Sequence, residues 1–159
     1  MANLRIGIGY DLHRTIAGRP LVLGNITIPH EKGLDGHSDA DVVIHALIDA
    51  LTGAAGLPDV GQMFPNTDPQ YKGIDSGELL KATMARFAAT GWRIVNAYIV
   101  VLAQRPKLAP HKGAMVKRLA ELLGVGADQV NIKGKTGEGV DAVGEERAIA
   151  CHCVVLLER

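Results

Sequence analysis

The sequence predicts an α/β or α+β fold of two layers, in which a mixed β-sheet is covered on one face by three helices. Segments rich in β-branched and other apolar residues are interspersed with segments of helical periodicity, and capping residues mark the helix starts. The length of 159 residues and the 47% of hydrophobic residues suit one packed core. Because no internal repeat or linker divides the chain, we expect a single domain over residues 1–159.

The first part of the chain predicts strands. Residues 4–9, LRIGIG, alternate in the manner of a strand. Residues 21–29 are typical of two short strands joined by a two-residue turn at Gly24 and Asn25. The KGLDG segment at residues 32–36 is expected to be a loop.

A strongly apolar helix comes next. We expect it to begin at Ser38, where Asp41 completes a capping box three residues later, and to end near Ala55. The long loop that follows, over residues 56–73, is rich in Gly, Pro, Asn and Asp. A loop of this length is usually functional or disordered, and its large apolar residues favour an ordered, functional one.

The remainder predicts two further helices and three strands. Asp and Ser start the second helix and a glycine stops it, whereas a proline in the first turn starts the third. In order, we expect a helix over residues 75–91, a central strand over 92–103, a helix over 110–124, a strand over 130–135, a flexible loop over 136–146 and a last strand over 147–158.

The charge balance argues against two classes of partner. Lys and Arg together number 17, as do Asp and Glu, whereas a general nucleic-acid or membrane-surface binder is normally basic. No apolar stretch is long enough to cross a bilayer, and no signal or transit-like leader precedes the first strand. The two cysteines, Cys151 and Cys153, are expected to be buried and reduced. We therefore expect a bacterial cytoplasmic protein, although a processed plastid protein would show the same features.

The first helix carries a polar stripe on an otherwise apolar surface. Asp41, His45 and Asp49 follow one another at intervals of four, so they share one helix face. Polar groups on a buried helix need partners, water or a metal. Taken alone, the stripe favours a structural network, with one histidine held by two carboxylates, over a metal site.

A second polar pair favours the metal. Asp11 and His13 stand two positions apart at the end of the first strand, so both side chains point to the same side of the sheet. Together with His45 they would form two imidazoles and a carboxylate, a recurring set of three protein ligands for zinc that leaves a fourth position open. Asp49, and with it Asp41, is then a candidate to hydrogen-bond to a ligand imidazole and fix its tautomer.

Several spaced segments resemble one enzyme family, the 2-C-methyl-D-erythritol 2,4-cyclodiphosphate synthases, over essentially the whole chain. GYDLHR resembles the family's G-[FY]-D-x-H start, and residues 32–69 resemble its longest signature almost continuously. AQRPKLAPH and VNIKGKTGE resemble its cytidine and diphosphate loops. The sequence departs from the signature at Asn66, where an aspartate is usual.

The resemblance implies an activity and an assembly. The family substrate is 4-diphosphocytidyl-2-C-methyl-D-erythritol 2-phosphate, whose 2-phosphate attacks the β-phosphorus, so that CMP leaves and a cyclic diphosphate closes. This phosphorus–oxygen lyase belongs to non-mevalonate isoprenoid biosynthesis. The resemblance also implies a homotrimer with active sites between neighbouring subunits, one Zn²⁺ held by Asp11, His13 and His45, and a Mg²⁺ or Mn²⁺ that joins the substrate diphosphate with help from Glu138.

Further roles carry over from matching positions in the family. His37 and Thr136 match donors that steady the transition state, and Ser38 matches a contact to the erythritol phosphate region. Asp59 and Gly61 match contacts to sugar hydroxyls. The substrate-binding residues implied in this way are Asp11, His13, His37, Ser38, Asp59, Gly61, Phe64, Asn66, Asp68, Ala103, Pro106, Lys107, Leu108, Ala109, Lys135, Thr136 and Glu138.

Two other classes of protein stay open on the sequence. A zinc hydrolase could use the same three ligands to activate water, but it would need a general base beside the open position. A trimeric binding protein without catalysis could share the sheet, but it gives no reason for the polar stripe on an apolar helix.

Overall fold

The computed structural model describes residues 3–159 as a mixed α/β fold built on a five-stranded sheet. The strands lie in the order β4-β1-β7-β5-β6, and a separate two-stranded ribbon joins β2 to β3. Most neighbours are antiparallel, but β5 and β6 run parallel, so the sheet is mixed as expected. The strands are β1 (Leu4–Ala17), β2 (Leu21–Leu23), β3 (Ile26–Ile28), β4 (Lys32–Leu34), β5 (Arg93–Leu102), β6 (Val130–Lys135) and β7 (Ala148–Glu158).

The helical segments connect these strands. The longer helices are α1 (Val42–Ala55), α3 (Ser76–Ala88) and α4 (Lys112–Leu123). Three short turns of helix lie in the two segments that the sequence predicts as loops, and a fourth lies between α4 and β6; runs of three or four residues carry no helical period that a sequence could show. The short helical turns are α2 (Val60–Met63), Pro69–Tyr71, Ala127–Gln129 and α5 (Asp141–Gly144).

Strand β1 is longer than its sequence indicates. It was expected over residues 4–9 but continues to Ala17, because it pairs with β7 as far as Arg14 and then with β4. The expected loop at residues 32–36 contains β4 for the same reason. Pairing with partners distant in the chain thus stabilises polar strand residues that have little intrinsic preference for a strand. Asp11 and His13 therefore lie within a strand, opposite β7, rather than at a strand end.

Helix α1 starts three residues later than expected. Asp41, not Ser38, is its N-cap, and the Asp41 carboxylate accepts hydrogen bonds from the backbone N–H groups of Val43 and Ile44. Ser38 instead accepts a hydrogen bond from the backbone N–H of Ala40. The capping-box pattern therefore identified the right region but the wrong residue.

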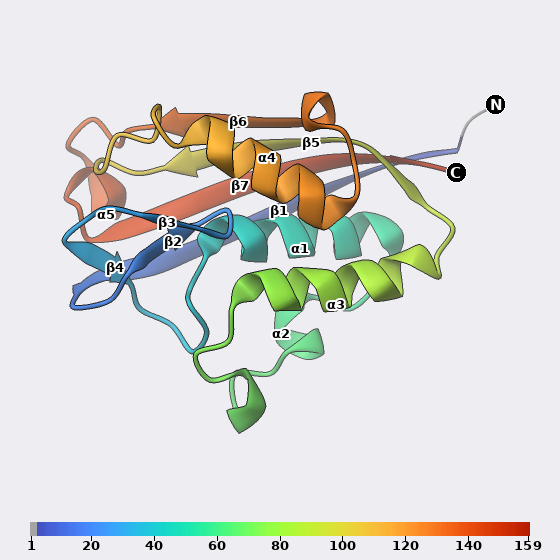
Figure 1. The fold of residues 1–159 in the computed structure, drawn as a ribbon, viewed down its shortest axis with the longest axis horizontal. Helices are drawn as coiled ribbons and strands as arrows, with labels where there is room; N and C mark the ends of the chain where they lie inside the picture. Colours follow the sequence, from blue (N-terminus) through green and yellow to red (C-terminus); the bar gives the residue numbers. More distant parts are fainter. Residues whose placement is uncertain (1–2) are drawn as a thin grey trace.

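Helix α1 packs directly on the sheet, where β1 offers glycines at the contact. A Cβ atom at Gly7 or Gly9 would overlap the backbone of α1. Helix α4 packs on β6, while α3 packs mainly against α1 and α4 rather than on the strands (Figure 1). The three predicted helices are present, but the sequence did not show that α3 packs mainly on the other two helices.

The other face of β1 is exposed and apolar. Ile6, Ile8, Tyr10 and Leu12 alternate with the residues that face α1, and they remain 73%, 69%, 52% and 44% exposed. Large apolar side chains gathered on one face are typical of an interaction surface. Within residues 3–159, no helix combines the length and hydropathy needed to cross a membrane.

Candidate metal centre and its surroundings

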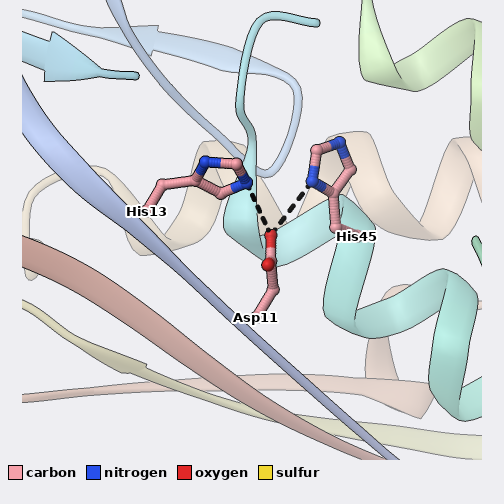
Figure 2. Close-up of side chains that lie close together, drawn as sticks. All are labelled: Asp11, His13 and His45. Carbon is pink, nitrogen blue, oxygen red and sulfur yellow. Dashed lines mark hydrogen bonds and ion pairs between the residues drawn. The ribbon is translucent and has the colours of Figure 1, made fainter. Parts of the chain in front are cut away.

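The structure brings together the three side chains that the sequence singles out. Asp11 and His13 project from β1 toward α1, and His45 projects back toward them (Figure 2). One carboxylate oxygen of Asp11 lies 3.1 Å from His13 Nε2 and 3.0 Å from His45 Nδ1. One ligand atom from each of the three residues lies within 4.8 Å of the other two. This convergence confirms the predicted cluster.

The electrostatics of the cluster favour an ionised Asp11. Burial raises the pKa of Asp11, but hydrogen bonds with His13 and His45 outweigh burial and hold it well below its ordinary value. Burial lowers the pKa of His13, yet the contact with Asp11 produces a net rise. Two imidazoles and one anionic oxygen thus surround a point where a divalent cation can replace protons as the positive partner.

The outer nitrogens of both imidazoles are also engaged. His13 Nδ1 lies 2.5 Å from the backbone carbonyl oxygen of Asp35, which fixes Nδ1 as the donor and turns Nε2 inward. His45 Nε2 lies 3.0 Å from Ser76 Oγ and 3.3 Å from Ser38 Oγ. Metal-binding histidines almost always carry such a partner on the nitrogen that faces away from the ion. The donor set and its supports therefore fit a metal with three protein ligands.

The two acidic residues of the helix stripe have other partners. The Asp41 carboxylate accepts hydrogen bonds from the backbone of Gly24 and Asn25 at 3.0 and 2.7 Å, in addition to its two bonds at the start of α1. Asp49 accepts a hydrogen bond from the backbone N–H of Val60 at 2.8 Å. Neither bonds to an imidazole, so the prediction that they orient the ligand histidine is wrong. The hydrogen bonds of Asp41 thus connect the β2–β3 turn to α1, and that of Asp49 connects α2 to α1.

A cavity of about 470 Å³ opens beside the cluster. The segment between β4 and α1 forms one wall, and the guanidinium of Arg19 braces this segment by donating to the carbonyl oxygens of Gly36 and Ser38 at 2.8 and 2.6 Å. The residues after α1 form the opposite wall. The predicted site residues that line this cavity are Asp11, His13, His37, Ser38, His45, Gly61, Phe64 and Asn66.

Two predicted substrate contacts act locally as helix caps. Asp59 accepts a hydrogen bond from the backbone of Gln62, and Asp68 accepts one from the backbone of Gln70. The carbonyl oxygen of Asp68 also lies 3.2 Å from His37 Nε2. Both aspartates therefore order the segment after α1 that walls the cavity, whatever else they contact.

All but one of the remaining predicted residues line a second, separate cavity of about 230 Å³, and the exception is Glu138. It lies where β5 and β6 end, and Thr136 there donates to Glu138 through a 2.6 Å hydrogen bond. Glu138 has a positive φ of 51°, which turns the chain sharply after β6. The predicted site residues of this cavity are Ala103, Pro106, Lys107, Leu108, Ala109, Lys135 and Thr136. Within one chain, the metal cluster and the predicted cytidine loop thus do not share a cavity.

Comparison with known proteins decides the family. A family model described as the YgbB family matches residues 4–158. The chain belongs to the YgbB family.

Related YgbB-family proteins carry a common name. A curated protein from Dechloromonas aromatica, named 2-C-methyl-D-erythritol 2,4-cyclodiphosphate synthase, is 54% identical over 157 residues, which are 99% of this chain and 98% of that protein. A solved synthase described as bound to CDP has a TM-score of 0.89 at 41% identity, with 96% of this chain and 99% of that chain covered. The bifunctional IspDF from Campylobacter jejuni has a TM-score of 0.95 at 37% identity, and the match covers 99% of this chain but only 43% of that longer chain.

Two elements of this YgbB-family site were absent from the sequence interpretation. Ser76 reaches His45 from the start of α3, and Arg19 braces the cavity wall from the turn after β1. Neither residue stands at a regular spacing from the three predicted ligands, so no local pattern could identify them. A buried serine at a helix start looks like an ordinary capping residue.

Proposed function

We propose that this chain catalyses the metal-dependent cyclisation of 4-diphosphocytidyl-2-C-methyl-D-erythritol 2-phosphate to 2-C-methyl-D-erythritol 2,4-cyclodiphosphate, with release of CMP. The observation that carries the proposal is the convergence of Asp11, His13 and His45 beside an open cavity. The names of the relatives give the cyclic diphosphate as their product, and one solved relative is described as bound to CDP. The identity of the substrate is what the resemblance of the sequence implies. The reaction is a phosphorus–oxygen lyase step in non-mevalonate isoprenoid biosynthesis, and Cys151 and Cys153, buried and unbridged, suit the bacterial cytoplasm in which we place it.

In this proposal the three-residue cluster holds Zn²⁺, and Glu138 helps to hold Mg²⁺ or Mn²⁺ on the substrate diphosphate. These ions supply the positive charge that two phosphate groups need in order to approach each other, which a protein of zero formal net charge does not supply as a whole. Imidazole and carboxylate ligands suit zinc, whereas a carboxylate beside phosphate oxygens suits magnesium or manganese.

The chain's own side chains would position and polarise the substrate. His37 lies in the cavity wall, where its Nε2 donates to the backbone carbonyl oxygen of Asp68, and a phosphoryl oxygen of the substrate would replace that carbonyl as the acceptor. Lys107 and Lys135 add positive charge to the second cavity, where the backbone of residues 103–109 would hold the cytosine. Little covalent chemistry is required of the protein, because positioning and charge stabilisation dominate phosphoryl transfer.

Product analysis tests the reaction directly. The purified chain, supplied with zinc, magnesium and the substrate, is expected to release CMP and form the cyclic diphosphate in equal amounts. ³¹P NMR would distinguish this product from the linear phosphates that a zinc hydrolase would release. Linear products alone would overturn the proposed function and favour the hydrolase.

Thr136 offers a test of the roles within the site. Replacing Thr136 with alanine removes a hydroxyl donor from the second cavity, and turnover is expected to fall about 10²-fold, the usual effect of losing one donor to a developing anion. Zinc content, measured by mass spectrometry of metals, should stay unchanged because Thr136 lies outside the metal cluster. A parallel loss of zinc would contradict the assigned role.

We further propose a homotrimer in which each active site combines the metal cluster of one subunit with the cytidine loop of its neighbour. Two observations support it: the predicted residues line two separate cavities of one chain, and the uncovered face of β1 is apolar. A neighbouring chain that covers this face would bury the exposed side chains and complete the site.

The assembly is open to a mutational test. Replacing Ile8 with aspartate would place a charge at the centre of the apolar face, so we expect the trimer to dissociate and turnover to collapse. Sedimentation measurements should give three chains for the natural protein and fewer for I8D. The matched control, Lys117→Asp on the exposed side of α4, should remain trimeric. A natural chain that sediments as a monomer, yet turns over, would refute the shared site.

A further inference from the structure

A buried hydrogen-bonded chain leads from His45 away from the metal cluster. Ser76, the first residue of α3, is fully buried and its Oγ lies 3.0 Å from His45 Nε2. On its other side, the same Oγ donates a short hydrogen bond to the carboxylate of Asp39. Three elements thus meet behind His45, namely α1, the start of α3 and the loop before α1.

The donors and acceptors in this chain fix the direction of each proton. Asp39 also accepts hydrogen bonds from the backbone N–H groups of Ser76 and Asp41, at 2.9 and 3.1 Å, so its carboxylate acts throughout as an acceptor. The single hydroxyl proton of Ser76 therefore points to Asp39. A lone pair of Ser76 Oγ therefore faces His45 Nε2. Toward this nitrogen, Ser76 Oγ can only accept a hydrogen bond.

This direction matters because the other nitrogen of His45 has a competing partner. His45 Nδ1 lies 3.0 Å from Asp11, and a proton on Nδ1 would donate to that carboxylate. A metal can bind Nδ1 only when that nitrogen carries no proton. An acceptor behind Nε2 stabilises the tautomer with the proton on Nε2 and so leaves Nδ1 free.

We propose that Ser76, oriented by Asp39, is a positioning residue that holds His45 in the tautomer able to bind the metal. The proposal rests on the metal site of the proposed function. It assigns to α3, which contributes none of the three ligands, a direct influence on metal affinity.

Ser76 can be tested because its hydroxyl is not needed to start the helix. Asp75 is the N-cap of α3 and accepts a hydrogen bond from the backbone of Gly77 at 2.7 Å. The bond from the backbone N–H of Ser76 to Asp39 also survives in an alanine variant. Ser76→Ala therefore removes the contact to His45 and leaves both anchors of the helix in place.

The experiment measures the zinc dissociation constant of the metal-free protein by competition with a chromophoric chelator. Loss of an outer partner of a metal-binding histidine typically weakens binding 10- to 100-fold, and we expect a weakening of about this size for Ser76→Ala. Ser38, at 3.3 Å from His45 Nε2, is the weaker acceptor and should not replace Ser76. In the zinc-loaded natural protein, the Nε2–H proton of His45 should give a slowly exchanging ¹H NMR signal that S76A loses.

Thr83 supplies the matched control. It is a second fully buried hydroxyl on α3, but it donates to the carbonyl oxygen of Leu79 within the helix, away from the cluster. Thr83→Val should destabilise α3 without changing zinc affinity. Equal weakening in T83V would show that zinc affinity follows helix stability alone, and it would overturn the proposal.

The remaining outcomes separate this inference from the proposed function. If the natural protein binds zinc and S76A binds it equally tightly, the positioning role is refuted while the metal site stands. If the natural protein binds no zinc, the metal site fails and the positioning role fails with it.

Discussion

Replacing His45 with alanine is expected to abolish stable zinc binding and lower CMP release by at least about 10²-fold. His45 is the one ligand that comes from the helix layer, so its loss leaves only Asp11 and His13 on β1. Two ligands on one strand cannot enclose a cation that needs three protein donors. Metal analysis after dialysis and a CMP-release assay would measure the two effects.

The loss should be specific to this imidazole. His30→Ala removes a histidine that lies outside the cluster and should leave zinc content unchanged. Melting temperatures should be recorded for both variants, because H45A also removes one hydrogen-bond partner from the Ser76 hydroxyl and one from the Asp11 carboxylate. A folded H45A that keeps zinc would show that the cluster is not the metal site.

The three residues of the candidate metal cluster were predictable from sequence because each depends on local periodicity. Asp11 and His13 share a strand face at a spacing of two, and His45 stands out on a helix that is otherwise apolar. The convergence of the two elements follows once α1 packs on β1, which the apolar surface of α1 requires. The periodic features of the chain therefore determined this part of the site.

The partners of the polar residues were not predictable in the same way. The spacing of four indicates that Asp41 and Asp49 lie about one helical turn from His45. It does not specify which groups of other elements lie opposite each side chain. Backbone N–H groups of the β2–β3 turn donate hydrogen bonds to the Asp41 carboxylate, and a backbone N–H group of α2 donates one to the Asp49 carboxylate. The actual partner of His45 is Ser76, 31 residues away, and only the packing of α3 on α1 brings it there.

The strands show the same limit. The hairpin at Gly24 and Asn25 was predictable because both residues tolerate the positive φ values, 62° and 59°, that its turn requires. The extension of β1 to Ala17 was not, because it depends on pairing with β7 and β4 rather than on the residues themselves. Local turn chemistry can be read from a short segment, whereas pairing across the chain cannot.

Replacing Gly9 with alanine is expected to destabilise the whole fold, because β1 and α1 touch at this position through their backbones. A Cβ atom at Gly9 would overlap the carbonyl oxygen of Ala46 and lie 2.8 Å from the backbone nitrogen of Ala50. Both obstacles belong to the backbone of a buried helix, so no side-chain rotation can relieve them. The helix must move off the strand, and its apolar contacts with β1 and β7 open with it.

The expected cost is about 3 kcal/mol or more, the upper range for added atoms in a packed core. For a chain of this length, that corresponds to a fall in melting temperature of roughly 10 °C. Circular dichroism during heating and during urea titration would measure it. Zinc affinity should fall as well, since Gly9 lies two residues before Asp11 and the displaced helix carries His45.

Gly53 lies in α1, and its replacement with alanine is expected to have the opposite effect on stability. A Cβ atom there meets nothing within 4 Å, so Gly53→Ala adds helix propensity without a clash and should stabilise the protein by up to about 1 kcal/mol. The two glycine-to-alanine changes thus add the same atoms but are expected to change the stability of the protein in opposite directions. Equal melting temperatures for G9A and the natural chain would mean that α1 does not lie against β1 as closely as the metal cluster requires.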